Sequence, residues 1–133
     1  MAEYTKKNLK SDVSDSAEQF GMADNLEARF GSDDLGLEKF AFSYQRFEPN
    51  FRLPFGHRQK QQEEVYLVLE GSGRMKLEDE VIEIEQWDAI RVPAETTRGF
   101  ESGDQGMALI AIGAPKVGDA RADGDPIPGW WSD

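Results

Sequence analysis

Residues 54–73 have the sequence PFGHRQKQQEEVYLVLEGSG. The second half of this stretch has the period of two that is typical of a β-strand, in which successive side chains point to opposite faces. We predict that the inner face of this strand carries Glu64, Tyr66 and Val68, and that the outer face carries Val65, Leu67 and Leu69. The following Gly71-Ser72-Gly73 triplet is typical of a turn and is expected to end the strand.

The chain from Leu26 to Gly113 has the same rhythm. Short runs rich in β-branched and aromatic residues alternate with Gly, Pro, Asp or Asn, and none has a sustained helical period. This pattern predicts an all-β sandwich or closed barrel, and periodicity alone leaves an up-and-down barrel and a jelly roll both open. A length of 133 residues fits one domain. We predict a barrel over residues 26–113, a loose N-terminal arm over 1–25 with at most one helical turn, and an irregular C-terminal tail over 114–133.

The composition excludes several classes of function. Fifteen Lys and Arg against 26 Asp and Glu give a net charge of −11, which repels nucleic acids and anionic membrane surfaces, so neither is an expected partner. The chain has no Cys, which excludes disulfides and thiol chemistry, and one His, His57, which excludes mechanisms that need two imidazoles from one subunit. No apolar run reaches the roughly 20 residues of a membrane span. No secretory signal is visible, and we expect a cytoplasmic protein.

Two stretches resemble the motifs of the cupin superfamily, in its small single-domain cupin 2 type. Residues 54–73 resemble the first motif, in which His-x-His precedes a Glu and a strand leads into Leu-Glu-Gly. Residues 87–100, WDAIRVPAETTRGF, resemble the second, in which a Gly-Asp turn and a strand lead into Pro-x-Gly and then a His. The resemblance implies a cupin-type jelly-roll barrel, the double-stranded β-helix, and a homodimer that pairs through sheet edges.

The resemblance also implies a metal site with three His and one Glu, whose positions fall on His57, Gln59, Glu64 and Arg98. Glu64 is preferred over Glu63 because it stands seven residues before Gly71, as the ligand of the family does. A Gln amide is a weak donor and a guanidinium stays protonated, so we expect a degenerate site with no metal and no cofactor. We predict instead that Arg98 takes the place of the metal and holds Glu64 in a bidentate pair inside the barrel.

These residues predict a small-molecule-binding barrel protein without a working metal centre. The expected binding residues are His57, Gln59, Glu64, Tyr66 and Arg98, with spare donors of Arg98 holding a small anionic metabolite. An alternative is an enzyme, either a metal-free isomerase or lyase with His57 and Glu64 as base and acid, or a weak metalloenzyme that adds Gln59 and water. A dimeric structural scaffold is a third possibility. The absence of further His, Cys or Lys at the expected site favours binding over catalysis.

Both ends of the chain carry predictions about packing. The adjacent Trp130 and Trp131 stand in a polar tail and are predicted to pack against the barrel or a partner subunit. The N-terminal arm is long enough to cross to the partner in the expected homodimer.

Overall fold

The computed structural model describes residues 2–118 and 123–132 of the chain. Residues 1, 119–122 and 133 of the predicted arm and tail lie outside the described residues. The elements are, in chain order, η1 (Ala17–Phe20), β1 (Leu26–Phe30), α1 (Ser32–Leu35), β2 (Ala41–Phe47), β3 (Phe55–Gln59), β4 (Glu63–Leu77), β5 (Glu80–Glu85), β6 (Ala89–Val92), β7 (Arg98–Ala114) and β8 (Gly124–Pro128).

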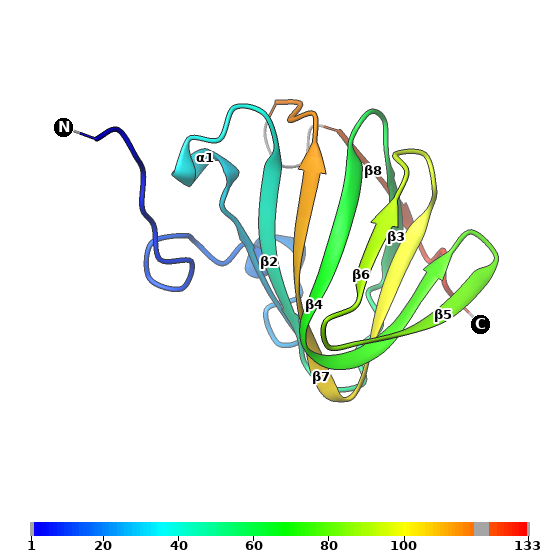
Figure 1. Ribbon diagram of the computed structural model, residues 1–133. Helices are drawn as coiled ribbons and strands as arrows, with labels where there is room; N and C mark the ends of the chain where they lie inside the picture. Colours follow the sequence, from blue (N-terminus) through cyan, green and yellow to red (C-terminus); the bar gives the residue numbers. More distant parts are fainter. Residues whose placement is uncertain (1, 119–122, 133) are drawn as a thin grey trace.

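The strands form a curled antiparallel sheet that wraps around one core (Figure 1). Its order is β1-β2-β7-β3-β8, while β4 pairs with β5, β6 and β7. Neighbours that are far apart in sequence, such as β2 with β7, exclude a simple up-and-down barrel. The all-β jelly-roll barrel predicted from the sequence is therefore confirmed. Within the described part of the chain, no helix has the length and apolar character that crossing a membrane requires.

The long strands β4 and β7 form the central pair of the sheet. They pair from Glu63 opposite Ala114 to Leu77 opposite Arg98, with register shifts on either side of Gly71. The turn predicted at Gly71-Ser72-Gly73 is wrong, because β4 bends there and continues. The two backbones approach so closely at the bend that a Cβ on Gly73 would collide with the carbonyl oxygen of Glu101. Glycine is needed here for close approach and not for chain reversal.

The core lies inside the curl of the sheet. The alternation predicted for β4 is confirmed, since Tyr66 and Val68 are buried while Val65 and Leu67 are only half-buried on the outer face. The largest fully buried side chains are Arg98, Tyr66, Phe47, Met75, Leu109, Val68, Val92 and Ser32. Arg98 is the one charged side chain in this set, and its charge requires a partner in the interior.

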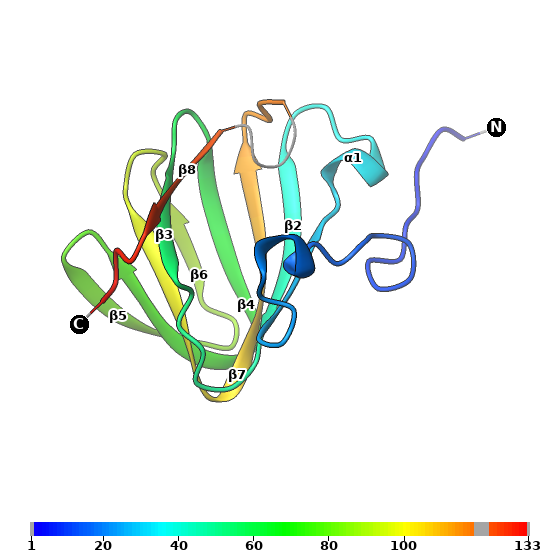
Figure 2. The same cartoon turned by 180° about the vertical axis from the view of Figure 1, so that it is seen from behind.

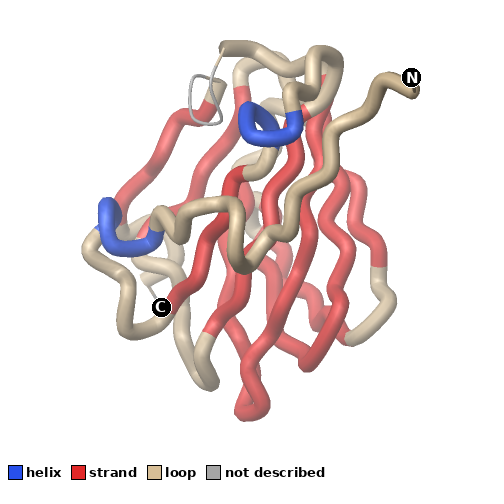
Figure 3. The backbone as a smooth tube through the Cα atoms, turned by 90° about the vertical axis from the view of Figure 1, so that its left-hand side faces the viewer, coloured by secondary structure: helices blue, strands red, loops and turns tan. Residues whose placement is uncertain are grey.

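The N-terminal arm has one helical turn, η1, as predicted, but it is not loose throughout. Val13, Ala17 and Met22 are buried. The carboxylate oxygen Oδ1 of Asp15 accepts hydrogen bonds of 3.0 Å from the backbone N–H groups of both Ala17 and Ala28. These bonds tie the turn to β1, and Figure 2 shows it beside the sheet. The first residues of the arm extend away from the barrel (Figures 1 and 2), and Figure 3 shows the arm in front of the strands.

The C-terminal tail is more ordered than predicted. β8 pairs with β3, with Phe55 opposite Pro128 and Gln59 opposite Gly124, so the prediction of an irregular tail is wrong for these residues. The sequence of β8, GDPIP, does not resemble a strand, because proline has no backbone N–H and disrupts most strands. Proline is tolerated in an edge strand, and β8 lies at the edge of the sheet. The adjoining Trp131 is 6% exposed and Trp130 lies against Gly56 and Gly99, so the predicted packing of the two tryptophans on the barrel is confirmed.

Candidate functional site

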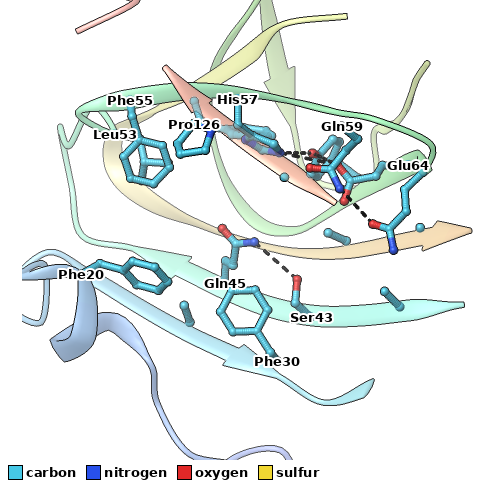
Figure 4. Close-up of a pocket in the computed structure, with 18 of the residues that line it drawn as sticks. Phe20, Phe30, Ser43, Gln45, Leu53, Phe55, His57, Gln59, Glu64 and Pro126 are labelled. Carbon is cyan, nitrogen blue, oxygen red and sulfur yellow. Dashed lines mark hydrogen bonds and ion pairs between the residues drawn. The ribbon is translucent and has the colours of Figure 1, made fainter. Parts of the chain in front are cut away.

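A cavity of about 400 Å³ lies inside the barrel. This volume is within the range of about 300–1,000 Å³ that is common for small-molecule sites. One part of its lining is apolar and comes from the arm, from β1, β2, β3, β7 and β8, and from the segment before β3: Phe20, Met22, Leu26, Ala28, Phe30, Ala41, Phe42, Leu53, Phe55, Phe100, Ala111 and Pro126. The polar part comprises Ser32, Ser43, Gln45, His57, Gln59, Gln62, Glu64, Tyr66 and Asp125. Figure 4 shows Phe20, Phe30 and Gln45 across the cavity from His57, Gln59 and Glu64.

The carboxylate of Glu64 is the centre of the polar part. The Tyr66 hydroxyl donates a hydrogen bond of 2.5 Å to its Oε1. Nη2 of Arg98 lies 3.3 Å from the same oxygen, and Nε2 of His57 lies 3.6 Å from it. The hydroxyl of Tyr66 is also 3.5 Å from Nε2 of His57. These four side chains therefore form one cluster.

Strand geometry brings this cluster together. Glu64 and Tyr66 are two residues apart on β4, so both point inward, while Glu63 points outward and pairs with Arg91. Of the two, Glu64 lines the cavity and Glu63 does not. His57 on β3 stands directly opposite Arg98 on β7 in the strand register. The cluster is a product of three paired strands.

The surroundings of Glu64 shift the pKa values of two groups. Burial alone raises the pKa of Glu64, but the donors of His57 and Tyr66 and the positive charges of His57 and Arg98 outweigh it, so the pKa lies below its ordinary value of 4.5. Burial and the negative charge of Glu64 both raise the pKa of the Tyr66 hydroxyl well above its ordinary value of 10.0. Tyr66 therefore stays a hydrogen-bond donor and Glu64 stays a carboxylate near neutral pH.

Arg98 lies inside the barrel, as predicted, and has no exposed surface. Its Nη1 donates to the backbone oxygens of Ala94 at 3.2 Å and Thr96 at 2.8 Å, which pins the loop between β6 and β7. The predicted bidentate pair is wrong: the contact with Glu64 runs from Nη2 alone, and neither Nε nor Nη2 makes a well-aligned hydrogen bond to a described residue. Arg98 is also not among the described residues that line the cavity, so it contacts Glu64 on the side that faces away from the cavity.

Gln59 lines the cavity as predicted, and two residues that sequence reasoning missed hold it in place. Its Nε2 donates to Oε1 of Gln62 at 3.0 Å and lies 3.5 Å from Oδ2 of Asp123. The buried carboxylate of Asp123 also accepts from the backbone N–H groups of residues 60, 61 and 62. Gln62 could have been found, because it continues the alternation of Glu64 and Tyr66. Asp123 carried no local signal, since it lies about 60 residues downstream of its partners.

Comparison with solved structures identifies the fold. A cupin protein from Bacteroides fragilis matches with a TM-score of 0.70 and 22% identity, over 89% of this chain and 89% of that chain. A variant of oxalate decarboxylase from Bacillus subtilis matches with a TM-score of 0.78 and 16% identity, over 96% of this chain and 33% of that chain. This chain has the cupin fold. A sugar phosphate isomerase of the cupin superfamily from Silicibacter pomeroyi matches with a TM-score of 0.62 and 21% identity, over 70% of this chain and 61% of that chain.

The cupin resemblance of residues 54–73 and 87–100 is confirmed at the level of the fold. Because these three identities are 22% or lower, the likeness shows the fold and not the activity. No family model and no curated protein sequence matches the chain.

The donor set of this cupin barrel does not fit the metal that the family resemblance implies. Arg98 stays protonated and offers no lone pair, and the amide of Gln59 is a weak donor. Glu64 Oε1 already faces the guanidinium and the Tyr66 hydroxyl. Among the described residues, no three His, Cys, Asp or Glu side chains gather in a way that could hold a metal ion.

Proposed function

We propose that this cupin barrel binds a small molecule in its cavity and works without a metal centre. The observation that carries the proposal is the buried ion pair between Arg98 and Glu64 at 3.3 Å. In the metal-binding pattern that the family resemblance implies, the carboxylate would be balanced by a cation from solution. Here the guanidinium of Arg98, which is part of the chain and fully buried, balances the charge of the Glu64 carboxylate permanently.

The cavity supports binding through its shape and its mixed lining. It combines an apolar wall with a few polar groups, which is the usual composition of a ligand pocket. The sequence predicted an anionic ligand that would contact spare donors of Arg98. The complete burial of Arg98 argues against that contact, and His57 is then the one group with a potential positive charge among the described lining residues. The proposed ligand is therefore not an anion.

The test is calorimetric titration of the full chain with Zn²⁺, Ni²⁺ and Mn²⁺, beside a double variant with Gln59→His and Arg98→His. We expect no tight binding by the parent and stoichiometric binding by the double variant, because the variant restores the three imidazoles and one carboxylate that such metals prefer. Tight stoichiometric binding by the parent would contradict the proposal and would favour a metal-dependent enzyme that uses His57, Gln59 and Glu64.

A second candidate function is metal-free proton transfer, as in an isomerase or lyase. It is favoured by the convergence of His57 and the Tyr66 hydroxyl on one carboxylate, within 3.6 Å and 2.5 Å of Glu64 Oε1. One structural neighbour is described as a sugar phosphate isomerase, but a phosphate would find no Lys or Arg among the described lining residues. The experiment is incubation with dihydroxyacetone in D₂O, followed by NMR. Exchange of its carbon-bound protons that His57→Gln abolishes would favour catalysis, and no exchange above buffer would favour binding alone.

A further inference from the structure

The apolar wall of the cavity is aromatic. Five of the described phenylalanines line it: Phe20, Phe30, Phe42, Phe55 and Phe100. They come from η1, β1, β2, β3 and β7, so their rings approach the cavity from several directions. Aromatic side chains pack best against flat apolar groups, in stacked or edge-to-face arrangements. The wall is therefore suited to a ring.

The size of the cavity limits that ring system. A cavity of about 400 Å³ lies near the lower end of the range of about 300–1,000 Å³ that is common for small-molecule sites. One ring, or two fused rings with a short substituent, fits this space.

Glu64 offers the cavity a hydrogen-bond acceptor. Its Oε1 is occupied by the Tyr66 hydroxyl, with Arg98 and His57 close by. Its Oε2 receives no hydrogen bond from the described residues, and 13% of the Glu64 side chain remains exposed. A carboxylate held in place through one oxygen presents the other in a fixed position. The group that satisfies it must donate a proton in a hydrogen bond, as a hydroxyl does.

The cavity offers an anion no free cation among its described lining residues. The charged groups there are Glu64 and Asp125, which pair with Arg98 and Arg58 from outside the lining, and His57 adds a positive charge only when it is protonated. A carboxylate or phosphate on the ligand would leave water without gaining a permanent cationic partner at this wall, which is costly. A neutral head group avoids this cost.

We infer that the ligand is an uncharged aromatic or alicyclic molecule whose hydroxyl group donates a hydrogen bond to Glu64. This inference rests on the proposed function, since it names the class of molecule that the same cavity takes.

The experiment uses three one-ring probes that differ in the head group: benzyl alcohol, toluene and benzoate. Their affinities for the full chain are measured by NMR titration, and binding in the cavity is identified from the shifts of the Phe20, Met22 and Tyr66 signals. We expect benzyl alcohol to bind most tightly, toluene more weakly because it has no donor, and benzoate at least about tenfold more weakly than benzyl alcohol.

Two variants separate the head-group contact from the apolar contact. The double change Glu64→Leu with Arg98→Met removes the acceptor and both charges together, because an Arg98 left without Glu64 threatens folding. It is expected to reduce the preference for benzyl alcohol over toluene to about twofold or less and to remove most of the discrimination against benzoate. The control Phe20→Ala shortens the apolar wall far from the carboxylate and is expected to weaken all three probes by a similar factor.

The outcomes distinguish the inference from the proposed function. If benzoate binds most tightly, or toluene equals benzyl alcohol, the assigned ligand class is wrong while small-molecule binding stands. A preference for benzyl alcohol that survives the Glu64 variant also overturns the inference. If none of the probes shifts the cavity signals, both the inference and the proposed binding function are overturned.

Discussion

The packing of Trp130 on Gly56 provides a sharp test of how the C-terminal tail stabilises the barrel. A Cβ added at Gly56 would lie 2.5 Å from Cε3 and 3.0 Å from Cδ2 of the Trp130 ring. Ordinary contacts between carbon atoms are about 3.5–4.0 Å. Gly56→Ala therefore forces the indole away from the strand by about 1 Å or more. The same displacement disturbs the contact of Lys76, whose Nζ lies 4.8 Å from the centre of that ring.

The expected change in the free energy of unfolding is the balance of two unfavourable effects and one favourable effect. Overpacking of this kind costs about 1–3 kcal/mol, and a loosened cation–π contact adds about 0.5 kcal/mol. Replacing glycine reduces the entropy of the unfolded chain and returns about 0.4–1 kcal/mol. The net loss in the free energy of unfolding is about 0.5–3 kcal/mol, with a midpoint of about 2 kcal/mol, or about 7 °C in the melting temperature for a domain of this size.

The assay is urea unfolding of the parent, Gly56→Ala, Trp130→Ala and the double variant. We expect Gly56→Ala to cost about 2 kcal/mol in the parent but about 1 kcal/mol or less once the ring is gone, which is a coupling of about 1 kcal/mol. The remaining cost arises because the added Cβ would still lie 3.1 Å from the backbone oxygen of Arg98. Gly99→Ala is a matched control, because its added Cβ would lie 3.3 Å from the same ring and requires only a small shift. Effects of the two substitutions that add within about 0.3–0.5 kcal/mol would refute the reasoning.

Further predictions concern the interior, acid stability and assembly. Arg98→Ala should cost about 3–5 kcal/mol in urea unfolding because it leaves Glu64 buried and unpaired, whereas Arg98→Met combined with Glu64→Gln should recover most of that loss; equal losses would contradict the pairing. Asp123→Ala should cost about 1–3 kcal/mol, because the backbone N–H groups of residues 60–62, of which that of Gln62 is buried, lose their carboxylate acceptor; a loss below about 0.5 kcal/mol would contradict this role. The pKa values of Glu27 and Glu101 are lowered: burial opposes the shift, but neighbouring Lys and Arg outweigh it. Their stabilisation is complete above the ordinary value of 4.5 and is lost as the pH falls through the lowered values, so the melting temperature should drop below about pH 4.5, and a flat profile there would exclude them. We also propose that the chain is a homodimer to which the N-terminal arm contributes, as the 80% exposure of Tyr4 suggests; light scattering should give twice the mass of one chain, and a monomer at micromolar concentration would contradict this.

The sequence by itself determined the fold class and the local chemistry of the site. Alternation along residues 63–69 placed Glu64, Tyr66 and Val68 on one face, because the period of a strand is a property of the backbone and needs no partner. Charge and chemistry were equally local: a guanidinium at position 98 cannot ligate a metal in any fold. The expectation that His57, Gln59, Glu64 and Tyr66 share one site came from the family resemblance, and all four line the cavity.

Only the tertiary structure decided how these residues are used. Whether Arg98 faces the cavity or lies behind Glu64 depends on how the sheet curls to bring the start of β7, where Arg98 stands opposite His57, close to Glu64 on β4, and no local pattern encodes that curl. The same holds for Asp123, which reaches residues 60–62 only because β8 pairs with β3. Gly71 and Gly73 looked like a turn because glycine permits both a reversal and a close approach of two backbones, and the neighbouring strand selects between them. Contacts between residues far apart in sequence are selected by packing, so the shape and lining of the cavity became visible only in the folded chain.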